Sequence, residues 1–528
     1  MFDLLKNRWP LIVVLILFIM TKIPSLLLPY YWDESWPYAP AIIQMSHHGA
    51  SLLPTAVEPL LSRGHPLFFH FSAALWIKVF GSTFKSLHAF ALFISVLFLI
   101  TIYEAGYRIF NSRVAFIALL LVATDVFFFV QSTFVLFEVL VAFLCFFSIY
   151  LYVRGRYFYA TIALSALFLT KESGLIAGFI IGIDALIALF NAKEQLNVRL
   201  LRLMPVTIAC IVIGLFFILQ KHYNGWYVFP LYSETVLTKW SDILFRFRTC
   251  AIPTTFCMGY EYIIFFALLL YSAIAIITIR KARAFTLLFF AIPAILVYYF
   301  IDNKRFEWFT PGLDIAAVIL FMLFYICSLL SFAGKSFYDN LVQRRFILLL
   351  GFFILAFIIF SSFAYFIARY EMAAIIPVLF LLAVFFDMLI RQTNSILYYP
   401  LLMIIAVVAL FAFKNDEGWG DCNLGYKYGV KTQLAVVEFM ERSNFYDKNI
   451  ACSSFLETEH LTDRRTGFLS SDRTFNHITS AVDSTTDLVI FDDIETDKNY
   501  NSVLKNPHFE LIYHIEMHGV WADIFRRR

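Results

Sequence analysis

Long apolar segments recur along most of this chain, and they constrain its fold more than any other feature. Most of them are roughly 17–25 residues long, the length at which an α-helix crosses the apolar core of a bilayer. Of the 528 residues, 61% are hydrophobic and 15% are charged, whereas an ordinary soluble domain is about half apolar and about a quarter charged. The sequence therefore predicts an all-α polytopic membrane protein.

These segments predict about thirteen membrane-spanning helices. The first follows Lys6 and Arg8, as the apolar part of a signal peptide does. No small-residue cleavage site follows it and it is long enough to span, so we expect it to remain as a helix. The predicted spans are residues 9–29, 86–107, 114–131, 134–152, 157–171, 173–190, 203–221, 261–279, 284–301, 314–332, 346–368, 372–390 and 397–413.

The distribution of basic residues predicts the orientation of these helices, because Lys and Arg gather in the cytoplasmic loops of membrane proteins. With the N-terminus inside, the N-terminal residues and the cytoplasmic loops together contain 16 Lys or Arg and three Asp or Glu. The reverse orientation has no comparable support. An odd number of crossings then places the C-terminus on the extracytoplasmic side.

Residues 66–80 are apolar but do not fit this orientation as a span. Counting them as a crossing would invert every later loop and move the basic clusters outside, and about 15 residues is short for a crossing. We therefore expect a helix that lies in or dips into the membrane surface. It belongs to a first outer loop at residues 30–85.

The last part of the chain differs abruptly in composition from the apolar part before it. Its signals are a helical period at 431–442, buried strands at 449–454 and 486–491, and a terminal antiparallel pair at 509–516 and 520–526. About 110 residues are enough for a separate core. We expect residues 1–413 to form the transmembrane domain and residues 414–528 a small extracytoplasmic α/β domain.

Four of the seven cysteines fall on the predicted outer side, where disulfides are permitted. Cys250 and Cys257 lie in the outer loop 222–260, and Cys422 and Cys452 lie in the C-terminal domain. Four cysteines allow three connectivities. Pairing Cys250 with Cys257 and Cys422 with Cys452 is one hypothesis, and unpaired thiols are the other.

Charged residues in apolar surroundings are candidates for function, because they are costly to place there. Asp33 and Glu34 follow the first span within an aromatic run. Two adjacent carboxylates at a membrane interface suit a general base or a metal ligand, and interfacial anchoring by the aromatic residues is the alternative. Glu138 is a lone acid near the outer start of the fourth span.

Basic residues in the first outer loop form a second set of candidates. Arg63 and His65 open the apolar helix predicted at 66–80, and Glu58 lies just upstream. Basic groups beside a helix N-terminus bind anions such as phosphate. A turn followed by the start of a helix is the alternative interpretation.

Two more basic residues lie at the predicted outer ends of spans. Lys171 precedes Glu172 and divides an apolar run into two short spans, so it either faces a lipid phosphate or forms a self-neutralising pair. An outer Arg at a membrane boundary is disfavoured. Arg369, followed by Tyr370 and Glu371, therefore requires a partner, and a phosphate and Glu371 are the two candidates.

No pattern in the sequence predicts nucleotide or nucleic-acid binding, since neither GxGxxG nor GxxxxGK followed by Ser or Thr occurs. Glu58, His65, Glu138 and His222 are residue types that bind divalent metals. No helical HxxxH or CxxC spacing supports a site, however. A divalent metal ion is therefore left open as a cofactor.

In their order and topology, these residues resemble motifs of the glycosyltransferase C superfamily. The branch is that of the dolichyl-phosphate-mannose protein mannosyltransferases and the lipid A aminoarabinose transferases. Its members have an Asp-Glu after span one, an HPPL- or KPPL-type motif at an in-plane helix, an acid in the second outer loop, a Thr-Lys motif and an Arg-Tyr start to a late span. The matching elements, which cover essentially the whole chain, are Asp33-Glu34, Gly64-His65-Pro66-Leu67, Glu138, Thr170-Lys171 and Arg369-Tyr370.

The resemblance implies a polytopic glycosyltransferase that moves a sugar, with inversion, from a polyprenyl-phosphate-linked donor to a hydroxyl of a glycan, lipid or protein acceptor. The transfer is expected at the extracytoplasmic face of the bilayer. Asp33 is expected to be the general base, with Glu34 and Glu138 positioning the acceptor or a metal. The expected contacts to the donor phosphate are His65, Lys171, Arg369 and Tyr370, and the expected contacts to the rest of the substrate are Glu58 and Arg63.

The chain departs from the family pattern at the His-Pro element and in its domain content. Only one proline follows His65, and no Lys precedes Pro66. In the aminoarabinose transferases that Lys is associated with the phosphate, and His65 takes its place here. The soluble MIR domain of the eukaryotic protein mannosyltransferases has no counterpart in this sequence, so we expect a bacterial enzyme of the plasma membrane.

Two other functions compete with this one. A transporter or flippase of lipid-linked or small solutes is expected to show inverted repeats or paired Gly/Pro-broken spans near the membrane midplane, whereas the ionisable candidates here gather at one face. A polysaccharide polymerase or ligase has a large late outer loop, whereas the candidates here begin early in the chain. The transferase is favoured, and the transporter is the principal alternative.

Overall fold

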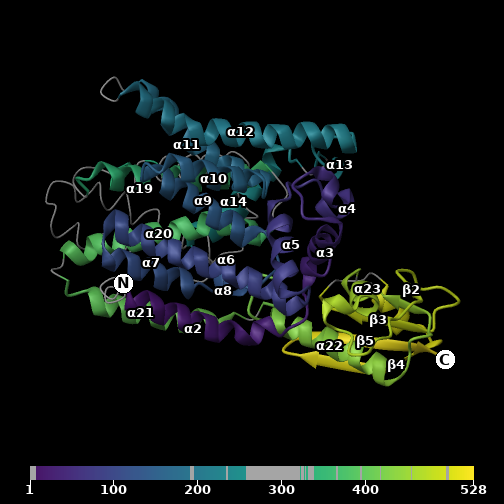
Figure 1. The fold of residues 1–528 in the computed structure, drawn as a ribbon. Helices are drawn as coiled ribbons and strands as arrows, with labels where there is room; N and C mark the ends of the chain where they lie inside the picture. The colour runs from purple at the N-terminus through teal and green to yellow at the C-terminus, as the bar shows by residue number, and fades with distance from the viewer. Residues whose placement is uncertain are drawn as a thin grey trace.

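The chain forms a helical bundle with a smaller sheet-containing domain at one end (Figure 1). The computed structural model describes residues 8–190, 195–233, 236–256, 322, 326, 329–330, 338–363, 367–392, 395–416, 418–452, 455–494 and 499–528. Helix α2, Trp9–Leu26, begins at the end of the bundle that lies away from the C-terminal domain and runs toward that domain (Figure 1).

The bundle is built from long apolar helices. Their bounds are α2 Trp9–Leu26, α6 Phe84–Ala105 with the π-helical turn η3 Gly106–Phe110, α7 Ser112–Ala123, α8 Val126–Gln131, α9 Glu138–Val153, α10 Tyr157–Phe168, α11 Leu175–Leu189, α12 Leu196–Asn224, α14 Trp240–Phe256, α19 Leu341–Phe363, α20 Met372–Gln392 and α21 Tyr398–Asn415. Helices α6, α7, α9 and α20 pack against one another in the middle of the bundle.

Seven helical segments among the described residues are long and apolar enough to cross a membrane. They are Trp9–Leu26, Phe84–Phe110, Glu172–Leu189, Leu196–Asn224, Leu341–Phe363, Ala368–Arg391 and Tyr398–Asn415. Apart from four positions of the last, the predicted spans 261–279, 284–301 and 314–332 lie outside the described residues. The multi-pass helical architecture is confirmed, and the total of about thirteen spans stays a prediction.

One predicted span, residues 114–131, is wrong as a continuous helix. Helix α7 ends at Ala123 and α8 begins at Val126. The break occurs because Asp125, which is fully buried, turns its carboxylate onto the start of α8 and accepts a hydrogen bond from Phe128 N at 2.8 Å. An Asp at this position satisfies a free N–H group of a new helix. Hydropathy alone does not detect such a break.

Glycines allow close approach between neighbouring helices of the bundle. A Cβ atom built on Gly178 of α11 would lie 2.3 Å from Cζ of Phe168, at the end of α10. Gly182, one turn later on the same helix, has more room, because its nearest neighbour would be Val206 Cγ1 at 3.6 Å. The ring of Phe168 therefore requires a glycine at 178 and not at 182.

Replacing Gly178 with Ala is expected to lower the thermal midpoint of the protein. Overpacking a well-filled core costs about 1–3 kcal/mol, which outweighs the gain of up to about 1 kcal/mol from the higher helix propensity of Ala. The midpoint can be measured in detergent by tryptophan fluorescence. Gly182→Ala is the matched control and should leave the midpoint unchanged or raise it, and equal midpoints for the two variants would contradict the packing argument.

The first outer loop folds into short helices at the end of the bundle beside the C-terminal domain (Figure 1). They are η1 Trp32–Glu34, α3 Tyr38–His48, η2 Pro54–Ala56, α4 Pro59–Ser62 and α5 Phe68–Phe80. Helix α5 confirms the helix predicted at 66–80, and it packs against α3 and α6. Its placement in the membrane surface stays a prediction.

The C-terminal domain is a five-stranded sheet of order β2-β1-β3-β5-β4. Its elements are α22 Tyr426–Arg442, β1 Ile450–Cys452, α23 Phe455–Thr462, η8 Arg464–Thr466, β2 Ile478–Thr479, β3 Leu488–Asp492, α24 Tyr500–Leu504, β4 Phe509–Met517 and β5 Val520–Arg527. Strands β4 and β5 form the predicted antiparallel pair, and α22 packs across both. The small α/β domain is confirmed, whereas the two-residue strand β2 was too short to predict.

The hypothesis of a disulfide between Cys422 and Cys452 is wrong. Cys422 is a buried free thiol, and its Sγ lies 3.3 Å from Oδ1 of the neighbouring Asp421. The turn that carries Cys422 faces the bundle, whereas Cys452 lies in β1 within the sheet. Cys250 is also a buried free thiol, and its proposed partner Cys257 lies outside the described residues.

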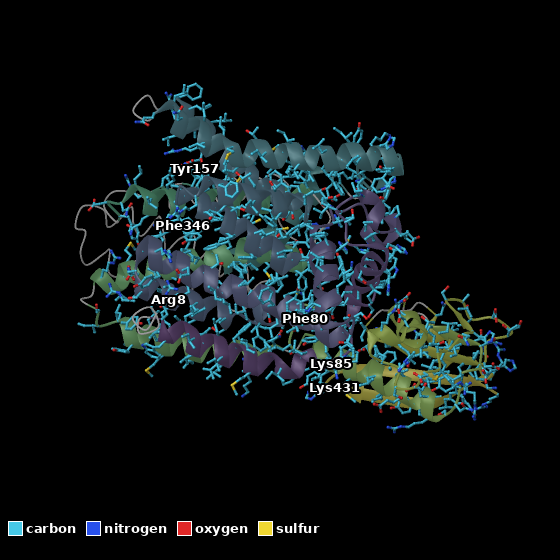
Figure 2. All side chains as sticks on the ribbon, in the orientation of Figure 1. Arg8, Phe80, Lys85, Tyr157, Phe346 and Lys431 are labelled. Atoms are coloured by element: carbon cyan, nitrogen blue, oxygen red, sulfur yellow. The ribbon has the colours of Figure 1, made fainter. Side chains whose placement is uncertain are left out.

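Basic residues predicted to be cytoplasmic lie at the opposite end of the bundle from this domain. Figure 2 labels Arg8 at that end, far from Lys431 of α22. Glu104 joins Arg8 and Arg108, at 2.8 and 2.7 Å respectively. The side of the membrane that each end of the bundle faces stays a prediction.

Candidate active site

The two acids that follow α2 point to different surroundings. They share the single turn η1, and Glu34 is almost fully buried. Its carboxylate accepts hydrogen bonds from Tyr31 N at 2.9 Å and Val135 N at 2.7 Å, and it lies 3.1 Å from His88 Nε2. Glu34 thus ties the first outer loop to the segment before α9, and Asp33 faces a different cluster.

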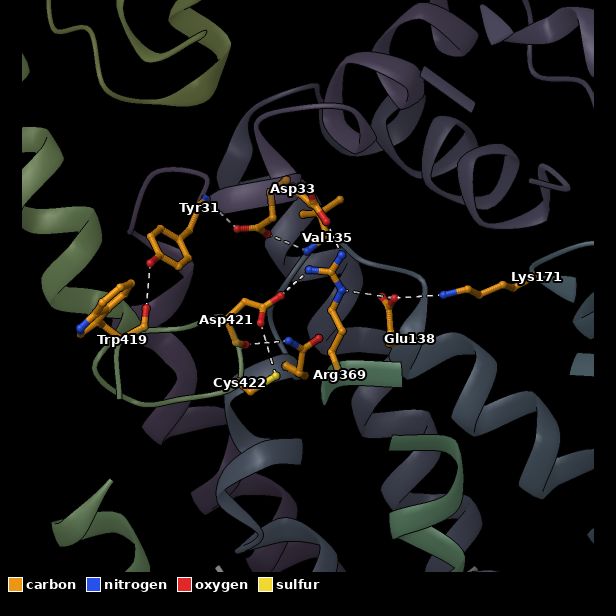
Figure 3. Close-up of polar contacts among 11 residues, drawn as sticks. Tyr31, Asp33, Val135, Glu138, Lys171, Arg369, Trp419, Asp421 and Cys422 are labelled. Carbon is orange, nitrogen blue, oxygen red and sulfur yellow. Dashed lines mark hydrogen bonds and ion pairs between the residues drawn. The ribbon is translucent and has the colours of Figure 1, made fainter. Parts of the chain in front are cut away.

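Arg369 is the centre of that cluster (Figure 3). It lies in η7, Ala368–Glu371, just before α20, and only 1% of its surface is exposed. Its Nη2 bonds to Asp33 and its Nη1 bonds to Asp421, while its Nε lies 3.5 Å from Glu138 Oε1. Three carboxylates from distant parts of the chain therefore surround one guanidinium group.

Lys171 is the second cation of the cluster. Its Nζ lies 3.4 Å from Glu138 Oε1, the same oxygen that faces Arg369. The ammonium group also lies 3.6 Å from the centre of the Tyr370 ring and 4.2 Å from that of Phe137, and such cation–π contacts stabilise a desolvated cation. Glu138 Oε2, in contrast, is buried and has no hydrogen-bond partner among the described residues.

We call Asp33, Glu138, Lys171, Arg369 and Asp421 the Arg369 cluster. Three carboxylates and two cations give it a formal charge of 2 − 3 = −1. Removing one member of a buried ion pair leaves a charge without compensation, which is strongly unfavourable. The five side chains therefore stabilise one another only when all of them are present. Replacing one charged partner by another of the same sign costs less than removing it.

The cluster brings together four of the residues predicted to form the site. Asp33, Glu138, Lys171 and Arg369 are in contact, and Tyr370 covers Lys171. The cluster excludes Glu371, which the sequence left open as a partner of Arg369. The Glu371 carboxylate instead accepts a hydrogen bond from Thr254 Oγ1 of α14 at 2.7 Å.

His65 lies next to the cluster rather than in it. Its Nδ1 is 2.8 Å from Glu172 Oε2, and its ring packs edge-on against Phe137, the residue that also contacts Lys171. His65 and Lys171 therefore both contact the Phe137 ring, beside the cluster.

The two predicted substrate contacts lie further out. Glu58 is exposed, and its backbone N–H donates to Gln44 Oε1 at 3.0 Å. The Arg63 guanidinium lies 5.1 Å from the centre of the Trp36 ring. No ion pair among the described residues joins either of them to the Arg369 cluster.

Two residues of the site were missed by the sequence analysis. Asp421 follows the last predicted span, so it is an acid near a membrane boundary, as Glu138 is. Asp416 and Glu417 precede it, and the sequence alone does not tell which of these acids faces the site. Tyr38 begins α3 and is almost fully buried. Its burial and the negative charges of Glu138 and Asp33 raise the pKa of its hydroxyl well above the usual value, so it faces the cluster as a neutral group.

The C-terminal domain holds the turn that carries Asp33. Tyr30 N donates to Thr466 O at 3.0 Å, and Tyr31 Oη donates to Trp419 O at 2.7 Å. Ser35 Oγ and His460 Nε2 share a buried hydrogen bond of 2.9 Å. These contacts fall on both sides of Asp33, so the domain restrains the position of its carboxylate.

Replacing Ser35 with Ala is expected to lower the thermal midpoint of the full chain. Burial lowers the pKa of His460 to about 3, so the ring is neutral, and it would lose its hydrogen bond to the hydroxyl. A buried polar group without a partner costs about 1–3 kcal/mol. Ser46→Ala is the control, because among the described residues that hydroxyl donates to Ile43 O of its own helix and to no other group. A midpoint equal to that of the control would show that this contact does not hold the two parts together.

A metal site receives no support from the described residues. No group of three or more His, Cys, Asp or Glu that could hold a metal ion occurs in the part of the chain that the structure describes. Asp33, Glu138 and Asp421 do converge, but they converge on a guanidinium group.

Comparisons with known proteins identify the fold. No family model and no curated protein sequence matches this chain. Among solved structures, ArnT from Cupriavidus metallidurans bound to undecaprenyl phosphate has a TM-score of 0.52 and 12% identity, with 98% of each chain covered. ArnT in the apo state has a TM-score of 0.49 and 11% identity, with 96% of this chain and 97% of that chain covered. The archaeal oligosaccharyltransferase AglB from Archaeoglobus fulgidus, in complex with an inhibitory peptide and a dolichol-phosphate, has a TM-score of 0.46 and 13% identity, with 98% of this chain and 74% of that chain covered. The likeness to ArnT extends over the whole chain and confirms the predicted fold class.

Proposed function

We propose that this chain, which has the glycosyltransferase C fold, transfers a sugar from a polyprenyl-phosphate-linked donor to an acceptor hydroxyl. The observation that carries the proposal is the Arg369 cluster, where the buried Arg369 guanidinium and the Lys171 ammonium lie beside the Asp33 and Glu138 carboxylates. ArnT, one of the solved structures with a similar fold, is bound to undecaprenyl phosphate, and this agrees with a lipid-phosphate substrate here.

Arg369 and Lys171 would contact the donor phosphate. A guanidinium binds phosphate through two parallel N–H groups, and Lys contributes a point charge. Both cations are held by Glu138 Oε1, which fixes them relative to each other. Tyr370 and Phe137 shield the ammonium from water. His65, oriented by Glu172, would approach the same phosphate from the side of Lys171.

Asp33 would be the general base. One of its oxygens, Oδ2, bonds to Arg369, and Oδ1 accepts no hydrogen bond from any described residue. A base needs one free oxygen within reach of the acceptor proton, and the ion pair fixes the orientation of the carboxylate. Glu138 Oε2 and the Tyr38 hydroxyl would position the acceptor, and Glu34 would hold the turn on which Asp33 lies.

The reaction would proceed as a single displacement. The acceptor oxygen forms a bond to the anomeric carbon while its proton passes to Asp33. The bond between that carbon and the phosphate oxygen breaks, and its electron pair leaves with the polyprenyl phosphate. Arg369 and Lys171 stabilise the charge that develops on the departing phosphate, as positive groups do at other phosphate leaving groups.

We propose the extracytoplasmic face of a bacterial plasma membrane as the place of reaction. The Arg369 cluster lies at the end of the bundle that contacts the C-terminal domain, and the basic cluster around Arg8 lies at the other end. In the proposed domain division, residues 1–413 carry the catalytic groups. Residues 414–528 brace the Asp33 turn and supply Asp421.

The test is sugar transfer in vitro. The full-length protein in detergent is incubated with a panel of radiolabelled polyprenyl-phosphate sugars and a crude membrane extract as the source of acceptor. We expect label from one donor to move into the extract, which would also identify the sugar. If the protein has a sharp thermal transition and consumes no donor, the transferase proposal fails and the transporter alternative takes its place.

A further inference from the structure

Asp421 occupies one edge of the guanidinium that the proposed reaction requires. Its carboxylate bonds to Arg369 Nη1 and lies 3.3 Å from Cys422 Sγ, and its backbone oxygen accepts a hydrogen bond from Gln131 Nε2 at 2.7 Å. Figure 3 shows Asp421 approaching Arg369 from the side of Trp419 and Cys422, opposite Lys171. It is the only member of the cluster from beyond the last helix of the described bundle.

In this arrangement no two adjacent nitrogens of Arg369 are both free for a phosphate. Its Nη1 bonds to Asp421 and its Nη2 bonds to Asp33. Its Nε lies 3.5 Å from Glu138 Oε1 and has no hydrogen-bond partner among the described residues. Phosphate binds a guanidinium best through two adjacent N–H groups. An anionic donor that entered the complete cluster, with its formal charge of −1, would also be repelled. Donor binding therefore requires one carboxylate to leave.

Asp421 is the carboxylate that is best placed to leave. Asp33 must stay as the base, and Glu138 holds both cations from the first turn of α9. Asp421 instead lies in a turn between α21 and α22, in the sequence Gly418-Trp419-Gly420-Asp421. Two glycines precede Asp421 within three residues, and glycine can adopt backbone conformations that other residues rarely adopt.

We propose that Asp421 occupies the phosphate position on Arg369 in the resting enzyme and withdraws when the donor binds. This inference rests on the proposed function. The ligand it concerns is a polyprenyl monophosphate ester or its sugar conjugate. While the site is empty, Asp421 keeps Arg369 in place as a positioning residue. After transfer, its return displaces the product, because its carboxylate competes with the phosphate for Nη1.

The test compares Asp421→Asn with the wild type in equilibrium binding of undecaprenyl phosphate. Both full-length proteins are studied in detergent by native mass spectrometry. The amide keeps the shape of the side chain but competes weakly for Arg369, so we expect the Kd to fall about 10-fold and the KM for the donor to fall with it. Loss of a purely structural contact would weaken binding, so a tighter complex separates the two roles.

Asp416→Asn is the matched control. Asp416 lies in the same turn and accepts hydrogen bonds from Asn423 and Leu424. It is not among the described residues that form ion pairs with Arg369. Asp416→Asn should leave the Kd for undecaprenyl phosphate unchanged. That result would show that the removal of one negative charge from the turn is not enough to tighten binding. Asp421→Ala is the second variant, and it should also bind undecaprenyl phosphate more tightly than the wild type.

Two results would overturn the inference, and they can be told apart. If the wild type transfers sugar and Asp421→Asn binds undecaprenyl phosphate as the wild type does or more weakly, the displacement of Asp421 is refuted and the transferase proposal stands. If the folded wild type neither binds undecaprenyl phosphate nor consumes a donor, the proposed function fails and the inference fails with it.

Discussion

Replacing Arg369 with Lys is expected to lower the turnover of donor about 10²–10³-fold, the loss typical of removing one group that stabilises a developing oxyanion. The substitution keeps the positive charge, so the loss comes from geometry. Arg369 directs three nitrogen atoms to Asp33, Asp421 and Glu138. An ammonium group is a compact point charge without the planar fork of a guanidinium, and it cannot hold those carboxylates and a phosphate in the same positions.

The same variant is expected to have a lower thermal midpoint, because Arg369 is almost completely buried among its partners. Breaking a buried pair costs about 3–5 kcal/mol when one charge is removed, and keeping the charge should limit the loss. Arg442→Lys is the control for an arginine on the surface. It is paired with Glu438 four residues earlier on α22 and is 80% exposed. That pair should contribute less than about 1 kcal/mol.

Turnover and thermal midpoint should be measured on the same preparations. A variant that keeps a sharp transition but loses turnover supports the catalytic role of Arg369. Wild-type turnover in Arg369→Lys would remove the observation on which the proposed function depends, since any cation at this position would then be sufficient.

Replacing Asp33 with Asn is expected to lower the rate of transfer about 10²–10⁴-fold, the range observed for the loss of a general base. The amide retains the size of the side chain and one oxygen that can accept a hydrogen bond from Arg369 Nη2. The interaction with Arg369 is therefore weakened but not removed. What is lost is the ability to take the proton of the acceptor. The effect should therefore appear in the rate constant of a single turnover, with donor binding retained.

The chain offers two matched controls for Asp33→Asn. Asp421→Asn also removes a carboxylate from Arg369, but we expect it to change donor affinity rather than the chemical step. Asp472→Asn removes a carboxylate that is 87% exposed and paired with Arg464 in the C-terminal domain, so it should alter neither. If Asp33→Asn transfers sugar at the wild-type rate, Asp33 is not the base. Glu138, with its unpartnered Oε2, would be the next candidate.

The sequence was sufficient to predict the elements and the kinds of residues at the site. The apolar lengths predicted the helices of the bundle, and the period-two pattern near the C-terminus predicted the β4–β5 pair. The cost of placing a charge beside the membrane selected Asp33, Glu138, Lys171 and Arg369. Each of these signals depends on a short stretch of chain, so each can be read without knowing the fold.

Contacts between distant segments were decided only by the tertiary structure. Asp33 and Arg369 are 336 residues apart in the chain. Asp421, which follows α21, the last helix of the bundle, contacts the same guanidinium group. The partner of Arg369 could not be chosen from the sequence, which offered a phosphate and Glu371, two residues further along. That residue lies on the opposite side of the turn and bonds to Thr254. The direction of a side chain at the start of a helix depends on the backbone dihedral angles there. Those angles cannot be predicted from the pattern of charged residues in the sequence.

The sequence by itself thus determined that this chain is a multi-pass helical membrane protein with a small α/β domain and a set of charged residues at helix ends. Only the tertiary structure decided that Glu34 and Asp33 point apart, that Asp125 interrupts a span, and that Cys422 carries a free thiol. The physical reason is that hydropathy and helix-end signals act over a few residues. Ion pairs, caps and disulfides depend on how the packed helices bring remote residues within a few ångströms of one another.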